Sequence, residues 1–153
     1  MEKIIGIIQN KPPLYALAGL IYILVSGLIK WQFNPPPDAL LFVMGGVLGV
    51  YFLDVAEVFF RLSPSPFRTI IFVASFAIVS FFVVTSSVSV LARGLVLTLH
   101  LMIMLLQISE WRAVGNLNSW YRDIAAPVSP GIQKNILIFF GILFTVETYL
   151  FLR

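Results

Sequence analysis

The run FRTIIFVASFAIVSFFVVTSSVSVLARGLVLTLHLMIMLLQI, residues 67–108, decides how many times this chain crosses a membrane. As one continuous helix it would be about 60 Å long, roughly twice the hydrocarbon thickness of a bilayer. The polar stretch TSSVS at 85–89 interrupts the run without a proline or a glycine. We therefore predict a tight hairpin at these serines, with one span at about 67–85 and the next at about 89–109.

Three further apolar runs lie on either side of this stretch, and prolines mark their ends. Pro12 and Pro13 precede the first run, prolines at 35–37 separate it from the second, and Pro130 opens the last. Proline suits the first turn of a helix and is excluded from its interior. The sequence therefore predicts an all-α, polytopic transmembrane helical bundle, one integral membrane domain over 1–153, with five spans at about 14–31, 38–60, 67–85, 89–109 and 132–152.

The composition supports a membrane as the surrounding solvent. Hydrophobic residues make up 59% of the chain and charged residues 11%, whereas a soluble domain carries about 25% charged residues. Few residues lie outside the apolar runs, so there is no room for a soluble domain. The chain has no cysteine, which excludes disulfides, thiolate metal sites and cysteine nucleophiles.

Lysines and arginines predict the orientation, because they are enriched in cytoplasmic loops. If the N-terminus is cytoplasmic, seven basic residues fall inside, namely Lys3, Lys11, Arg61, Arg68, Arg112, Arg122 and Lys134. Three fall outside, namely Lys30, Arg93 and Arg153. We expect a cytoplasmic membrane with the N-terminus inside and the C-terminus outside, since no targeting peptide is visible.

Two stretches are typical of helices that lie in the membrane interface. Residues 2–10 place three isoleucines on one side, and residues 111–125 place Trp111, Leu117 and Tyr121 at helical spacing. An apolar stripe of this kind usually rests in the headgroup plane. The alternative is a docking surface for a partner.

Ionisable residues inside the spans are the natural candidates for function, because each costs about 2.5–3.5 kcal/mol near a helix centre. Asp54, Glu57 and Arg61 follow one another at helical spacing and share a face of the second span. Glu57 and Arg61 are four positions apart and can form an ion pair at the helix end. Asp54 lies deeper and has no base four positions on, which makes it a stronger functional candidate.

Arg93 and Glu147 have opposite charges at matching predicted depths, near the outer ends of the fourth and fifth spans. This match predicts an interhelical ion pair between them. We favour a structural clamp that fixes the two helices. The functional alternative is a gate or a charge site in a transport path.

His100 lies near the middle of the fourth span, where the neutral imidazole is expected. It could hydrogen-bond to Asp54 or to a backbone carbonyl, join a proton or cation path with Asp54 and Glu57, or ligate a haem iron or chlorophyll magnesium. Gln107 and Glu110 continue its stripe toward the cytoplasmic end. The sharpest structural hypothesis is one polar seam of six residues, namely Asp54, Glu57, Arg61, His100, Gln107 and Glu110.

The second span also carries a helix-packing motif. Gly45 and Gly49 form a Gly-x-x-x-Gly pattern, which lets another helix backbone approach closely. The partner helix could belong to a second copy or to the same chain, and the motif alone does not choose between them.

No catalytic motif is visible, so the sequence favours a protein that is not an enzyme, with no cofactor and no metal site. Its expected partners are the lipid bilayer and other membrane-protein subunits or further copies of itself. Nucleic acid is not expected, since no basic stripe exists. The favoured function is a structural or accessory subunit of a larger membrane assembly. The alternative is a small proton- or cation-coupled transporter or channel component that uses an intramembrane Asp/Glu/His cluster.

Overall fold

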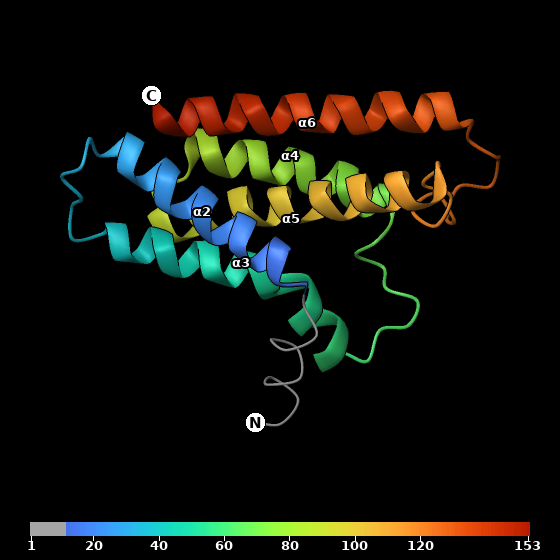
Figure 1. Cartoon of the computed structure of the whole chain (residues 1–153), viewed down its shortest axis with the longest axis horizontal. Coiled ribbons are helices and arrows are strands. Elements are labelled where there is room, and N and C mark those ends of the chain that lie inside the picture. The colour runs from blue at the N-terminus through green and yellow to red at the C-terminus, as the bar shows by residue number, and fades with distance from the viewer. Residues whose placement is uncertain (1–11) are drawn as a thin grey trace.

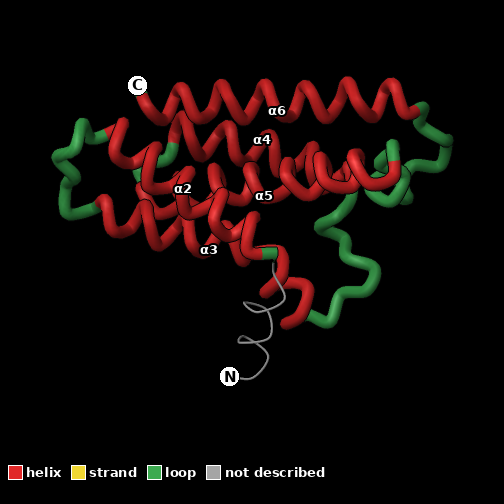
Figure 2. The backbone as a smooth tube through the Cα atoms, viewed as in Figure 1, coloured by secondary structure: helices red, strands yellow, loops and turns green. Residues whose placement is uncertain are grey.

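A computed structural model describes residues 12–153, so the interfacial helix expected at 2–10 lies outside the described residues. The described chain is all-helical and contains no strand (Figure 1, Figure 2). Its five helices are α2 (Pro13–Lys30), α3 (Ala39–Phe59), α4 (Ile70–Ser86), α5 (Val90–Val114) and α6 (Pro130–Leu152).

Successive helices run in opposite directions, and the chain passes back and forth along the long axis of the bundle (Figure 1). One end carries the connections 31–38 and 87–89 together with the C-terminus; we name it the short-loop end. The other end carries the connections 60–69 and 115–129, and we name it the long-loop end. α5 lies at the centre and contacts each of the other four helices.

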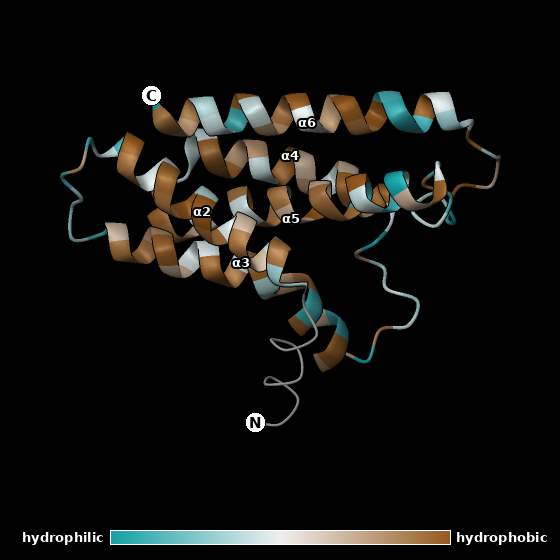
Figure 3. Ribbon diagram, in the orientation of Figure 1, coloured by the Kyte–Doolittle hydropathy of each residue, from teal (hydrophilic) through white to brown (hydrophobic). Residues whose placement is uncertain are grey.

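Four of the described helices, α2, α3, α5 and α6, are long and apolar enough to cross a membrane. α4 is also apolar but has 17 residues, which gives it a length of about 25 Å. Apolar residues dominate the helices, while hydrophilic residues are most frequent in the connections and at the long-loop end (Figure 3). The chain is therefore a helical bundle suited to a membrane, as the apolar composition indicates.

The hairpin predicted at 85–89 is present, and serine hydroxyls explain where it turns. α4 ends at Ser86 and α5 begins at Val90. The hydroxyl of Ser89 accepts a hydrogen bond from the amide of Ala92, and Ser87 accepts one from the amide of Ser89. A capped N-terminus satisfies amides that a helix leaves free, so a new helix starts without proline or glycine.

Glycines allow α3 and α5 to pack backbone against backbone. A Cβ atom on Gly45 would overlap the carbonyl oxygen of Leu91, and one on Gly49 would overlap that of Leu95. On the facing helix, a Cβ on Gly94 would overlap the carbonyl of Phe42. The structure thus uses the Gly-x-x-x-Gly pattern within the chain, with α5 covering both glycines.

The interfacial helix expected at 111–125 is not formed. Residues 111–114 are the last turn of α5, and Gly115 ends that helix in a left-handed conformation with a φ of 77°. A left-handed glycine is a common helix end because it carries no Cβ. Residues 118–123 form turns, and Leu117, Trp120 and Tyr121 are buried in the core of the bundle rather than on an interfacial stripe.

Candidate functional site

His100 is fully buried in the middle of α5, with an exposed fraction of 0%. Its ring stacks on Phe140 of α6, with 3.9 Å between the ring centroids and an interplanar angle of 27°. Phe76 of α4 and Phe144 of α6 approach the imidazole at centroid distances of 5.8 Å and 5.3 Å. Three phenylalanine rings therefore surround the imidazole and keep its environment apolar.

Two further polar side chains complete this buried site. The Nδ1 atom of His100 lies 2.8 Å from Oε2 of Glu147, and the hydroxyl of Ser80 donates to the same oxygen at 2.9 Å. Both Glu147 and Ser80 have an exposed fraction of 0%. The His–Glu–Ser site, defined by His100, Glu147 and Ser80, therefore joins α5, α6 and α4 through one carboxylate oxygen.

The remaining polar atoms of the site differ in how they are satisfied. The Nε2 atom of His100 lies 3.2 Å from the backbone carbonyl oxygen of Phe140, so it acts as a donor there. Oε1 of Glu147 is buried and has no hydrogen-bond partner within the described residues. The hydroxyls of Tyr22 and Thr148 bond to each other at 2.8 Å, on the α2 side of α6. Within the described residues, Oε2 of Glu147 thus has two hydrogen-bond partners and Oε1 has none.

The structure does not bring Arg93 to Glu147. Arg93 forms no ion pair within residues 12–153, and its Nε atom is buried without a hydrogen-bond partner. Glu147 instead meets His100, seven residues further along α5, which corresponds to about 10 Å of helical rise. The predicted pairing of Arg93 with Glu147 is therefore wrong by about two helical turns along α5.

The predicted polar seam is divided in two. Glu57 of α3 forms a bidentate ion pair with Arg68, with N–O distances of 2.7 Å and 2.9 Å. Asp54 and Glu110 also interact electrostatically with Arg68. The hydrogen bonds that Arg68 donates to Glu57 are the largest cause that raises the pKa of this guanidinium. His100 has its own partners on α4 and α6, so it does not share a cluster with Asp54.

Arg61 does not take the helix-end position expected for it. α3 ends at Phe59, and Arg61 follows with a φ of 53° and an exposed side chain. Because the chain has left the helix, Arg61 no longer lies one turn beyond Glu57. Arg68, which follows the Ser-Pro-Ser-Pro sequence at 63–66, is the base that pairs with Glu57.

The other two residues of the predicted seam lie toward the long-loop end of α5. Glu110 accepts hydrogen bonds from the hydroxyl of Ser119 and, at 2.9 Å, from the indole Nε1 of Trp120. Gln107 is buried, and its amide oxygen has no partner within the described part of the chain. Glu110 therefore holds the loop that follows α5.

Gln133, near the start of α6, was missed by the sequence analysis and is fully buried. Its amide oxygen accepts from the amide of Leu117 at 2.7 Å. Its amide nitrogen donates to Asn118 Oδ1 at 2.8 Å and to the carbonyl of Val128 at 2.9 Å. One side chain thus fixes the loop 115–129 against α6. The sequence feature that could have indicated this role is a glutamine in the first turns of an apolar span.

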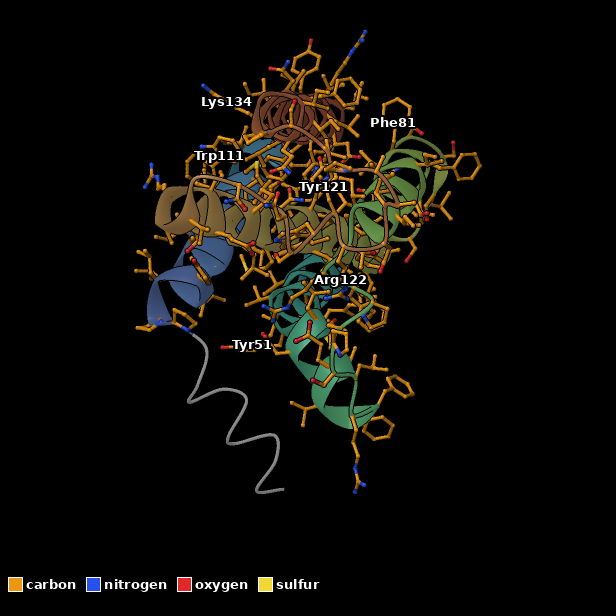
Figure 4. All side chains as sticks on the ribbon, turned by 90° about the vertical axis from the view of Figure 1, so that its right-hand side faces the viewer. Tyr51, Phe81, Trp111, Tyr121, Arg122 and Lys134 are labelled. Carbon is orange, nitrogen blue, oxygen red and sulfur yellow. The ribbon has the colours of Figure 1, made fainter. Side chains whose placement is uncertain are left out.

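The two long loops also contact each other at the long-loop end. Arg122 donates a hydrogen bond to the carbonyl oxygen of Ser65, and the amide of Ile70 donates to the carbonyl of Trp120 at 2.7 Å. Figure 4 looks onto this end, with Arg122 and Tyr121 between α3 and α6 and Lys134 pointing away. Burial raises the pKa of Tyr121 above its ordinary value.

Two of the hollows on the surface of the bundle lie near the elements described above. A groove of about 630 Å³ runs between α4 and α6 and is lined by apolar side chains, including Ala74, Ala77 and Phe139. A pocket of about 500 Å³ lies at the long-loop end beside Asn116, Tyr121 and Ser129. Neither lining includes His100, Glu147 or Ser80, although Phe140, which stacks on His100, lines the groove.

Comparison with known proteins gives no relative on which a function could be based. No protein family, no curated protein and no solved structure matches the chain. Across residues 12–153, no group of three or more His, Asp or Glu side chains could hold a metal ion. The chemistry must therefore be argued from the residues themselves.

Proposed function

We propose that this protein is a structural or accessory subunit of a larger membrane assembly. The observation that carries this proposal is that ionisable side chains of the helices hold neighbouring helices and loops together. Glu57 pairs with Arg68, Glu110 holds the following loop, and His100 bonds to Glu147. Each contact joins separate helices or a helix and a loop. Polar contacts that hold the helices in place, including the fully buried contact between His100 and Glu147, suit a structural role.

The groove between α4 and α6 supports the same proposal because it offers a contact surface for a partner helix. Its lining includes the small side chains Ala74 and Ala77 together with the aromatic side chains Phe81, Phe82 and Phe139. Small residues permit close helix approach in a membrane, and aromatic side chains offer a large apolar contact area. The groove carries no charged residue, so a membrane-spanning partner fits it better than a soluble one.

The proposed topology has five spans, with α4 as the short third span. The N-terminus is placed in the cytoplasm and the C-terminus outside, in a cytoplasmic membrane. Support comes from the basic residues in the connections 60–69 and 115–129 at the long-loop end. A C-terminal reporter enzyme that is active only outside the membrane should be active under this topology, and its inactivity would reverse the orientation.

The test of the subunit proposal uses the absence of native cysteines. Ile78, which lies in the groove and is 74% exposed, is replaced by cysteine. The control is Leu17→Cys on α2, which is also exposed, at 55%. After thiol cross-linking in native membranes, Ile78→Cys should give a discrete protein adduct that Leu17→Cys does not give. Monomer alone from both variants, together with purification of the protein alone in mild detergent, would count against the proposal.

A second candidate function is a component of proton- or cation-coupled transport. The observation in its favour is Oε1 of Glu147, a buried carboxylate oxygen that has no hydrogen-bond partner among residues 12–153. In proteoliposomes, ion flux should then be measurable and should be abolished by His100→Ala and by Asp54→Asn. Absence of flux through the wild-type protein would remove this candidate.

A further inference from the structure

We propose that His100 and Glu147 together bind one proton, held between Nδ1 of the imidazole and Oε2 of the carboxyl group. The inference starts from the 2.8 Å separation of these two atoms. A nitrogen and an oxygen approach this closely only when a hydrogen atom lies between them. This proposal does not depend on whether the protein works with a partner subunit.

The hydrogen-bond partners fix the proton count of the pair. Nε2 of His100 faces the carbonyl oxygen of Phe140, which can only accept, so Nε2 keeps its own hydrogen. Ser80 supplies the hydrogen of its contact with Oε2. One further proton is then needed, and it lies either on Nδ1 or on Oε2. The first arrangement is imidazolium with carboxylate, and the second is neutral imidazole with carboxylic acid.

Both arrangements have zero net charge, and the surroundings favour that result. Loss of the proton would leave a carboxylate whose lone pair faces the lone pair of Nδ1, while a second proton would leave a net positive charge. Either charge would be buried among Phe76, Phe140 and Phe144, where an isolated ion is strongly disfavoured. The site is therefore neutral when one proton lies between Nδ1 of His100 and Oε2 of Glu147.

Within residues 12–153, no other ion pair involves His100 or Glu147. α4 contributes the neutral hydroxyl of Ser80, and α6 contributes only Glu147 itself. From α2, Tyr22 is the nearest titratable group, and its hydroxyl is bonded to Thr148. On α3, the carboxylates of Asp54 and Glu57 interact with Arg68 instead. The proton itself is thus the positive charge that neutralises Glu147.

His100 is the only histidine of the chain, so a single-site experiment is available. The full-length protein, labelled with ¹⁵N-histidine and ¹³C-glutamate, is studied in lipid by nitrogen NMR and by infrared spectroscopy. NMR reports whether the ring is imidazolium or neutral, and the infrared bands report whether Glu147 is a carboxylate or an acid. Glu147→Gln assigns the glutamate band by its loss, and the wild-type protein alone suffices if this variant does not fold.

Two outcomes support the proposal, namely imidazolium with carboxylate, or neutral imidazole with carboxylic acid. In Glu147→Gln, Nδ1 should show the chemical shift of an unprotonated ring nitrogen, whichever arrangement the wild type has. Neutral imidazole beside carboxylate, or imidazolium beside carboxylic acid, would overturn it.

Discussion

Replacement of Gly49 by alanine should weaken the packing of α3 against α5. The added Cβ would overlap the carbonyl oxygen of Leu95 and lie 3.0 Å from the amide nitrogen of Leu99 and 3.1 Å from Cβ of Thr98. These neighbours include backbone atoms, so the helices must separate. Overpacking costs about 1–3 kcal/mol, and the better helix propensity of alanine returns up to about 1 kcal/mol. We expect a net destabilisation of about 1–2 kcal/mol.

Gly141→Ala is the matched control for this prediction. It makes the same chemical change inside α6, but its Cβ would meet only Sδ of Met104, at the ordinary contact distance of 3.6 Å. Helix propensity alone should then raise the stability, by about 0.5–1 kcal/mol. Thermal unfolding in mild detergent, followed by tryptophan fluorescence, compares the two variants. If Gly49→Ala unfolds at the same temperature as Gly141→Ala, the close approach of α3 and α5 is wrong.

Three further predictions concern the buried and exposed polar contacts. Glu147→Ala should lower the stability by about 3–5 kcal/mol, because His100 loses its partner. Glu147→Gln should lower it less, because its amide can still form a hydrogen bond. Equal melting temperatures for these two variants would contradict this prediction. Gln133→Ala should cost about 1–3 kcal/mol and expose the loop 115–129 to limited proteolysis, since buried backbone groups lose their partners. Arg68→Met should cost under about 1 kcal/mol, because the arginine is partly exposed, and Arg61→Met should have no measurable effect on the melting temperature.

Local signals account for the helices that the sequence predicted. Prolines at 12–13 and 130 mark helix starts, and Ser89 caps α5 where neither proline nor glycine is present. These signals act over three or four residues and need no knowledge of neighbouring helices. The hairpin at 85–89 could therefore be predicted from the sequence. The end of α5 could not, because it depends on how Gly115 and the following loop fold back.

The candidate site was harder to predict because it depends on how far one helix is shifted along another. His100 and Glu147 were both identified as unusual residues, but they were assigned different partners. Depth counted from helix ends places Glu147 level with Arg93, and the true partner lies about two turns away. That shift is set by contacts distant in sequence, such as Gln133 with the loop 115–129. No pattern within a single span records it.

The same limit explains the exchange of Arg61 for Arg68 as the partner of Glu57. Helical spacing favoured Arg61, provided that α3 continued past it. The helix instead stops at Phe59, and the turn that follows brings Arg68 back toward Glu57. A residue eleven positions away in sequence then forms the ion pair, which spacing rules for one helix cannot anticipate.

The contact between His100 and Glu147 is the central claim, and a magnetic dipolar coupling measures it directly. With ¹⁵N-histidine and ¹³C-glutamate in lipid-embedded protein, the single imidazole should show strong dephasing from one carboxyl carbon, as the 2.8 Å contact between Nδ1 and Oε2 requires. The dephasing should disappear in Glu147→Gln and remain in Glu57→Gln. Absence of dephasing in the wild type, or its persistence without Glu147, would contradict the account.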